Sequence, residues 1–88
     1  MTRPEIIDAL MAEYLEEVEG IKKYVKMIEG IKSTCPEYKY TKYMKMILKD
    51  EYQHQKLLLE ILTDMDAFVP EKISKAMTEA KEWYGKIS

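Results

Sequence analysis

Apolar side chains recur every three or four residues along most of this sequence, which is the spacing of one face of an α-helix. The longest stripe of this kind begins at Ile7 and ends at Ile31, and its one charged member is Glu17. A second stripe extends from residue 40 to residue 65, and a shorter third one from residue 73 to residue 87. The sequence holds 3 Gly and 3 Pro in 88 residues, so little of it favours turns. The pattern therefore predicts an all-α protein with three helices.

Capping residues set the expected helix boundaries. Residues 2–5 (Thr-Arg-Pro-Glu) and residues 34–37 (Thr-Cys-Pro-Glu) both have the pattern of a helix N-terminus, with a threonine cap and a glutamate three positions later. Gly30 is a suitable end for the first helix, and Pro70 a suitable start for the third. The short connection between the first two helices predicts an antiparallel hairpin. We expect one domain over residues 1–88, with helices at about 4–30, 35–65 and 70–86.

Charge and hydropathy limit the expected partners. The 14 basic and 16 acidic side chains are interspersed without a basic block and give a net charge of −2, so nucleic acid is not an expected partner. No apolar run approaches the roughly 20 residues that a membrane span needs, and the N-terminus lacks the apolar core of a signal peptide. The single cysteine, Cys35, has no partner within the chain. These features predict a cytoplasmic protein that does not associate with membranes.

The second apolar stripe contains two polar residues in its middle, Glu51 and His54, which lie one turn apart. An unpaired carboxylate is costly at a buried position, so these residues need a partner. If the hairpin turn is centred near Thr34, residues whose numbers add up to about 68 lie at the same height, which places Glu17 opposite Glu51. Carboxylates and imidazole together suit iron, manganese and zinc. Glu17, Glu51 and His54 are therefore the candidate metal ligands.

The second helix also carries apolar residues around much of its circumference, and a lone hairpin cannot cover them. Di-iron bundles use a Glu from each of two helices and a Glu-x-x-His from each of the other two, so one hairpin offers half of such a site. We expect two copies to form a four-helix bundle, as a homodimer or part of a higher homo-oligomer. The predicted cofactor is a di-iron centre across the interface, with manganese or zinc as possible metals.

The ligand pattern also resembles a known family. Glu17 followed by Tyr24, with Glu51-Tyr52-Gln53-His54 on the next helix, looks like one half of a ferritin-like protein of the rubrerythrin kind. A hairpin with a short third helix is similar to the encapsulated ferritins, which are half-bundles that dimerise. The resemblance covers residues 6–65. It implies that Glu51 bridges two irons, that Glu17 and His54 are terminal or partly bridging ligands, and that Fe(II) is oxidised by oxygen or peroxide.

Other interpretations stay open. Glu51 and His54 are also consistent with buried polar residues that fix helix register in a non-catalytic dimerisation or interaction module. A haem bundle that uses His54 and a methionine is a third possibility. It is also open whether the protein is an enzyme. The candidate activities are those of a ferroxidase and of a peroxide-reducing oxidoreductase, and any redox partner is unidentified. Gly20 is expected on the outer side of the first helix. Four residues are candidates for orienting the ligands or shaping access to them: Tyr24, Tyr52, Asp50 and Glu13.

Overall fold

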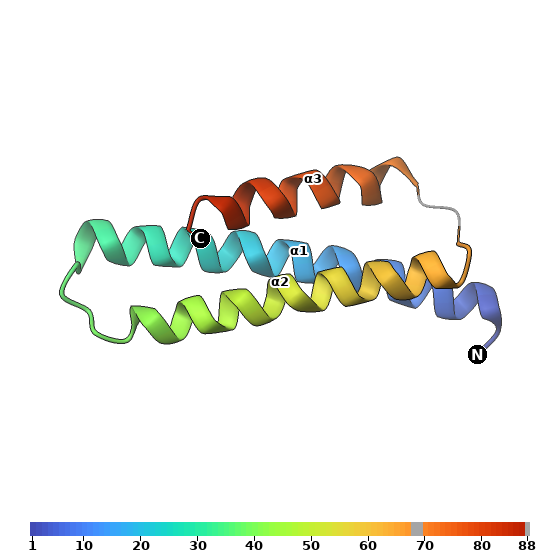
Figure 1. Ribbon diagram of the computed structural model, residues 1–88, viewed down its shortest axis with the longest axis horizontal. Helices are drawn as coiled ribbons and strands as arrows, with labels where there is room; N and C mark the ends of the chain where they lie inside the picture. The colour runs from blue at the N-terminus through green and yellow to red at the C-terminus, as the bar shows by residue number, and fades with distance from the viewer. Residues whose placement is uncertain (68–69, 88) are drawn as a thin grey trace.

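The computed structural model describes residues 1–67 and 70–87, and in these ranges it contains helices and no strand. Helix α1 spans Arg3–Thr34, α2 spans Thr41–Asp64 and α3 spans Glu71–Gly85. Helices α1 and α2 form a long antiparallel pair, and α3 returns along one side of it (Figure 1). The prediction of an all-α protein with three helices is confirmed. None of the described helices combines the length and the apolar character needed to cross a membrane.

The predicted α1 stripe forms the centre of the core. Its enclosed members pack with Leu48 of α2 and with the small or branched side chains that α3 presents, Ile73, Ala76 and Ala80. The start of α1 is also as predicted. The Thr2 hydroxyl accepts the Glu5 backbone N–H at 3.3 Å, and the Glu5 carboxylate accepts the Thr2 N–H at 3.3 Å. The buried α1 residues are Tyr14, Val18, Ile21, Val25 and Ile28.

The boundaries between α1 and α2 differ from the prediction. Helix α1 continues through Gly30 to Thr34, and α2 begins at Thr41 instead of near residue 35. The Thr34 hydroxyl donates back to the Gly30 carbonyl within the last turn of α1, so it does not cap a following helix. The Cys35 N–H continues the helix pattern by donating to the Ile31 carbonyl at 2.7 Å. Residues 35–40 therefore form the connection, and the second predicted capping motif is wrong.

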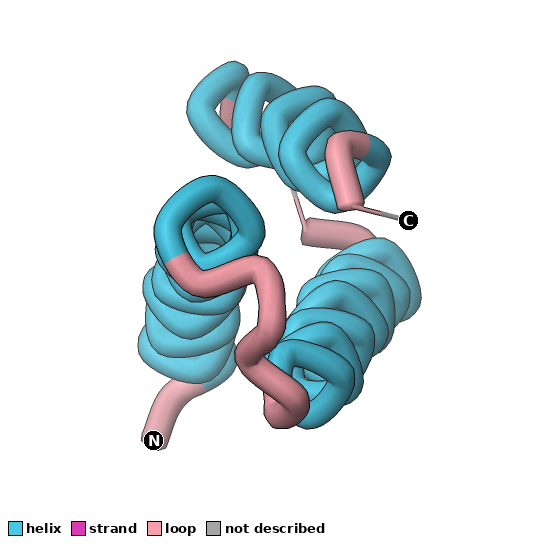
Figure 2. The backbone as a smooth tube through the Cα atoms, turned by 90° about the vertical axis from the view of Figure 1, so that its left-hand side faces the viewer, coloured by secondary structure: helices cyan, strands magenta, loops and turns pink. Residues whose placement is uncertain are grey.

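Helix α3 covers one side of the α1–α2 pair and packs mainly against α1. Seen along the helices, it lies beside the pair and leaves the opposite side open (Figure 2). Lys22 of α1 forms an ion pair with Glu79 of α3. Tyr52 of α2 stacks on Tyr84 of α3 with ring centroids 4.1 Å apart and an interplanar angle of 2°. These contacts bind α3 to one face of the hairpin only.

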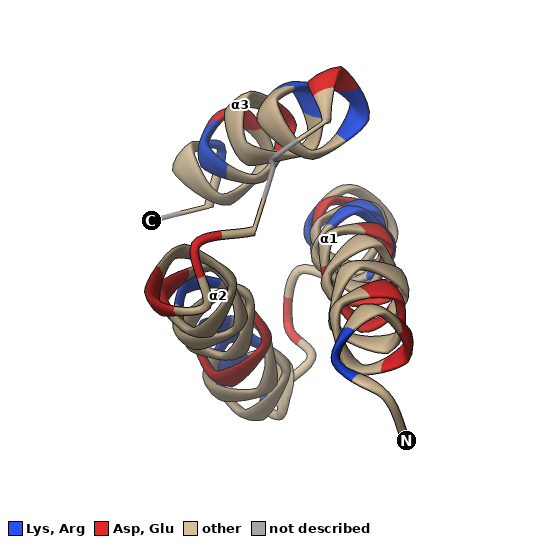
Figure 3. Ribbon diagram, turned by 90° about the vertical axis from the view of Figure 1, so that its right-hand side faces the viewer, with Lys and Arg blue, Asp and Glu red and all other residues tan. Residues whose placement is uncertain are grey.

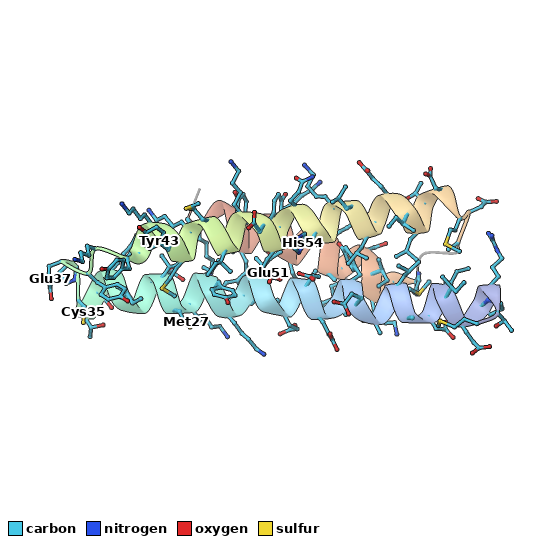
Figure 4. All side chains as sticks on the ribbon, turned by 90° about the horizontal axis from the view of Figure 1, so that it is seen from below. Met27, Cys35, Glu37, Tyr43, Glu51 and His54 are labelled. Atoms are coloured by element: carbon cyan, nitrogen blue, oxygen red, sulfur yellow. The ribbon has the colours of Figure 1, made fainter. Side chains whose placement is uncertain are left out.

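The predicted α2 stripe lies on the side of the hairpin away from α3. The residues of α2 that are enclosed are Leu48, Gln55 and Leu62, whereas Ile47 and Ile61 on the predicted stripe are 41% and 44% exposed. The prediction that this stripe is buried holds only in part for a single chain: Met44 and Leu58 pack against the core, whereas Ile47 and Ile61 stay exposed. We call this surface the open face (Figure 4). Its exposed apolar residues are Ile6, Met27, Tyr40, Tyr43, Ile47 and Ile61.

Candidate metal centre

The three candidate ligands lie together near the middle of the open face. Glu17 is close to the midpoint of α1, while Glu51 and His54 are near the midpoint of α2 and one turn apart on the same side of that helix. The His54 Nδ1 atom is 3.9 Å from Glu17 Oε1. Figure 4 shows Glu51 and His54 between the two long helices, with α3 behind them. The hairpin thus brings Glu17 close to both Glu51 and His54.

The register of the hairpin differs from the predicted one by three residues. Glu17 lies beside His54 instead of directly opposite Glu51, and Glu51 lies beside Gly20. A Cβ atom added to Gly20 would be 3.0 Å from Glu51 Oε2. The prediction that Gly20 lies on the outer side of α1 is therefore wrong. The shift follows from the helix ends, because the connection spans residues 35–40 and its centre lies beyond Thr34.

Glu17 is the most electrostatically perturbed group of the site. Its side chain is 15% exposed, and its pKa is raised from 4.5 to about 7. The main cause is a hydrogen bond with the Glu51 carboxyl, which requires a shared proton, and burial and the negative charge of Glu51 raise the pKa further. Among the described residues, Glu17 Oε2 is buried and has no hydrogen-bond partner. A cation placed here would balance two adjacent carboxylates and satisfy a buried acceptor.

His54 differs from Glu17 in its exposure. Its side chain is 57% exposed, and the 3.9 Å to Glu17 exceeds hydrogen-bond length. The prediction that His54 is buried is wrong for the single chain. Within residues 1–67 and 70–87, no three His, Cys, Asp or Glu side chains are grouped closely enough to hold a metal ion by themselves. One chain thus presents a carboxylate pair with an imidazole at its edge.

The four additional candidates lie in different surroundings. Glu13 is exposed, and its charge contributes to the raised pKa of Glu17. Asp50 is also exposed, next to Glu51 in the sequence. Tyr24 is partly buried against the core, and the stacking of Tyr52 on Tyr84 places its ring against α3. Of the four, Glu13 has the clearest electrostatic link to the site.

Two features were missed at the level of sequence. Gly20 leaves the space that the Glu51 carboxylate occupies, and its position three residues after Glu17 on the same helix face is the signal that could have revealed it. The second feature is Tyr14 of α1. It is fully buried, but its hydroxyl has no hydrogen-bond partner among the described residues, and burial raises its pKa to about 12.

Comparison with known proteins does not assign the chain to a family. No protein-family model matches the chain, and neither a curated protein nor a solved structure matches it. The resemblance to ferritin-like proteins of the rubrerythrin kind therefore stays a prediction that rests on Glu17, Tyr24 and residues 51–54.

Proposed function

We propose that this chain is a non-haem di-iron carboxylate protein that oxidises Fe(II) or reduces oxygen or peroxide at a centre assembled across a homodimer. The observation that carries the proposal is the state of Glu17. Its carboxylate is largely buried, lies against Glu51, has one oxygen without a partner and has His54 Nδ1 3.9 Å from the other. Such an arrangement destabilises a metal-free protein and is relieved by a bound cation.

The donor set fits iron. Two carboxylates and an imidazole are ligands that Fe(II) and Fe(III) accept, and manganese or zinc accept them as well. In the proposed centre Glu17 and Glu51 release the proton that they share when a metal binds. Glu13 adds negative charge close to Glu17, which favours the approach of a cation. When bound, a pair of irons supplies the electrons that reduce the oxidant.

A second copy completes the proposed centre. Exposed apolar side chains flank the three ligands toward both ends of the open face, with Tyr40 and Ile47 on one side and Ile61 on the other. Large exposed apolar surfaces are characteristic of interaction sites. Packing these residues against the same face of another copy would remove them from water and so stabilise a dimer. The dimer would then present four carboxylates and two histidines, the number found in di-iron bundles.

Metal content and Fe(II) oxidation test this proposal directly. We expect the purified protein to bind about one iron per chain and to consume oxygen or peroxide when Fe(II) is added. Glu17→Gln and His54→Ala are expected to abolish stoichiometric binding. Glu29→Gln, at an exposed position of α1 distant from the three ligands, is the control that should bind as the wild type does. A wild-type dimer that binds no metal, or a Glu17→Gln variant that binds it fully, would contradict the proposal.

The apolar open face also favours a second candidate function, a non-catalytic dimerisation or interaction module. In that case Glu51 and His54 serve as polar residues that select one helix register within the interface. The two functions predict different behaviour of His54→Leu. A module would form a more stable dimer after this change, because a polar group is replaced by an apolar one. A metal centre would lose iron, and the two outcomes are separated by measuring dimer affinity and metal content on the same sample.

A further inference from the structure

A groove lies between α2 and α3, on the side of the hairpin that α3 covers. Helix α3 packs mainly on α1, so it touches α2 along a short stretch only. The groove has a volume of about 550 Å³, which is within the range of small-molecule sites, about 300–1,000 Å³. Its apolar lining consists of Tyr52 and Leu59 of α2 and Met77 of α3. The proposed dimer uses the open face and would leave this groove accessible.

Gln55 is the buried polar residue of the described chain, with 4% of its surface exposed, and it lines this groove. Its amide group can donate two hydrogen bonds and accept others at its oxygen. Its side chain nevertheless forms no hydrogen bond with any of the described residues. A buried amide without a partner is costly, so a ligand that bonds to it from the groove would stabilise the folded protein.

Two lysines line the groove near Gln55, one from each helix. The stacked rings of Tyr52 and Tyr84 set the register between the antiparallel helices α2 and α3. Lys56 and Lys81 are each about one turn from this stack, so they lie at nearly the same height on the two walls. The Lys56 Nζ atom is 5.7 Å from the centroid of the Tyr52 ring. Neither lysine forms an ion pair within the described part of the chain.

The acidic residues of the groove lie farther from the stacked rings. Glu60 and Asp64 come two and three turns after the stack and belong to α2 alone. Glu60 follows Lys56 by four residues, yet these two side chains form no ion pair. Both helices carry acidic and basic residues (Figure 3), but only basic ones line both walls of the groove. The groove is therefore basic beside the stack and apolar in its middle, between Leu59 and Met77.

We propose that this groove binds a medium-chain carboxylate, whose charged group lies between Lys56 and Lys81. There the carboxylate accepts hydrogen bonds from the two ammonium groups and from the Gln55 amide. The alkyl chain extends along Leu59 and Met77, where its removal from water adds to the affinity. This inference goes beyond the proposed function and does not depend on the metal centre, because the three candidate metal ligands belong to the open face.

Titration of the metal-free full chain with decanoate, in the presence of a chelator, tests the site. Decanoate should saturate at one molecule per chain. In protein with ¹³C-labelled methionine methyl groups it should shift the signal of Met77, which Met77→Leu identifies, and leave that of Met27 on the open face unchanged. A shift at Met27 without one at Met77 would place the ligand on the open face and overturn the inference.

Two compounds with the same alkyl chain test the charge that the groove selects. Decanol and decylammonium should bind at least about tenfold more weakly than decanoate, because neither offers an anion to the lysines and the amide. Equal affinities for the three compounds would show that the groove takes only the alkyl chain. Tighter binding of decylammonium would assign the charged group to Glu60 and Asp64. Either result would overturn the inference.

Substitutions test the residues themselves. Lys56→Gln/Lys81→Gln should weaken decanoate binding at least about tenfold. Lys42→Gln/Lys72→Gln is the matched control, since it changes exposed lysines of the same two helices that do not line the groove. Gln55→Leu should also weaken binding, and it should raise the urea midpoint of the ligand-free protein because an unpaired buried amide is replaced by an apolar group. Unchanged decanoate affinity in Lys56→Gln/Lys81→Gln and in Gln55→Leu would overturn the inference.

The outcomes separate this inference from the proposed function. A protein that binds decanoate in the groove but no iron refutes the di-iron centre and leaves the carboxylate site intact. A protein that binds about one iron per chain but no decanoate refutes the carboxylate site and supports the centre.

Discussion

The Glu51 carboxylate occupies the space that Gly20 leaves on the opposite helix. A Cβ on Gly20 would be 3.0 Å from Glu51 Oε2 and 3.6 Å from its Cδ. This contact sets how closely Glu51 approaches α1, and therefore how closely it approaches Glu17 one turn away.

Gly20→Ala is expected to separate stability from metal binding. Alanine in place of glycine inside a helix stabilises the folded state by about 1 kcal/mol. The new Cβ, however, displaces the flexible end of Glu51, and we expect metal affinity to fall about tenfold or more. Gly30→Ala is the matched control, since a Cβ there meets nothing within 4 Å in the same helix. Urea unfolding of the metal-free proteins and metal titration check both parts, and equal metal affinity in the two variants would contradict the role of Gly20.

The raised pKa of Glu17 makes the stability of the metal-free protein depend on pH. Its folded pKa, about 7, lies above the ordinary value of 4.5, so between these values the folded state binds more protons than the unfolded state. Stability should therefore fall as pH rises from about 4.5 to 7, by on the order of 1–3 kcal/mol. Urea unfolding from pH 4.5 to 8.5 measures this. Glu17→Gln removes the titrating group and should flatten the profile, whereas an unchanged slope would assign the effect to another group.

Metal binding should show the opposite dependence on pH. Since the Glu17–Glu51 pair holds a proton below about pH 7, a cation must displace that proton to bind. We expect affinity for Zn(II), chosen because it has no redox chemistry, to increase by about tenfold per pH unit below pH 7 and to level off above it. Calorimetric titration at several pH values checks this, and a flat profile between pH 5.5 and 7 would exclude the pair as the binding group.

One substitution on the open face should prevent association without unfolding the chain. Ile47 is 41% exposed on this face, so Ile47→Lys should cost the single chain little, whereas a lysine in the apolar part of the proposed interface should oppose dimerisation. Met46→Lys is the control at the adjacent position, which is 62% exposed and points away from the open face. Sedimentation analysis should show a monomer for the first variant and a dimer for the second. The same mass for both would argue against the open face as the interface.

The stacked pair Tyr52–Tyr84 should hold the C-terminal part of α3 against α2. Because α3 packs mainly on α1, this stack is a principal contact between α2 and α3, and Tyr84→Ala should destabilise the fold by about 1–3 kcal/mol. Tyr38→Ala, in the exposed connection, should cost less than about 0.5 kcal/mol. Urea unfolding measures both. Metal affinity should not change in either variant, since neither ring contacts the three ligands.

A helix could be predicted from the sequence where the periodic spacing of its apolar residues alone determines that it forms and which face it buries. The stripe from Ile7 to Ile31 is long and nearly uninterrupted, and it fixed both the existence of α1 and the face that it buries. The start of α2 was not predictable, because the Thr34 hydroxyl can cap a following helix or bond back to Gly30, and only the backbone conformation decides. The register of the hairpin depends on that choice and was therefore wrong by three residues.

The candidate site was predictable as a group but not in its internal arrangement. Glu17 and Glu51 were found because each interrupts an apolar stripe, and they meet in spite of the shifted register because a glutamate side chain can reach across one 5.4 Å turn. The exposure of His54 could not be predicted, since it depends on how α1 and α3 share the circumference of α2. Sequence periodicity alone cannot distinguish a helix face covered within the chain from one that stays open.

The one-sided placement of α3 also limits the size of the assembly. Two copies that associate through identical open faces use the same patch on each partner, and such a contact is closed by a two-fold axis. The opposite face of each hairpin is already occupied by its own α3, so it offers no equivalent surface to a third copy. A chain with both hairpin faces uncovered could add copies without end and form fibres. In the proposed dimer, the short third helix would therefore restrict the assembly to two copies.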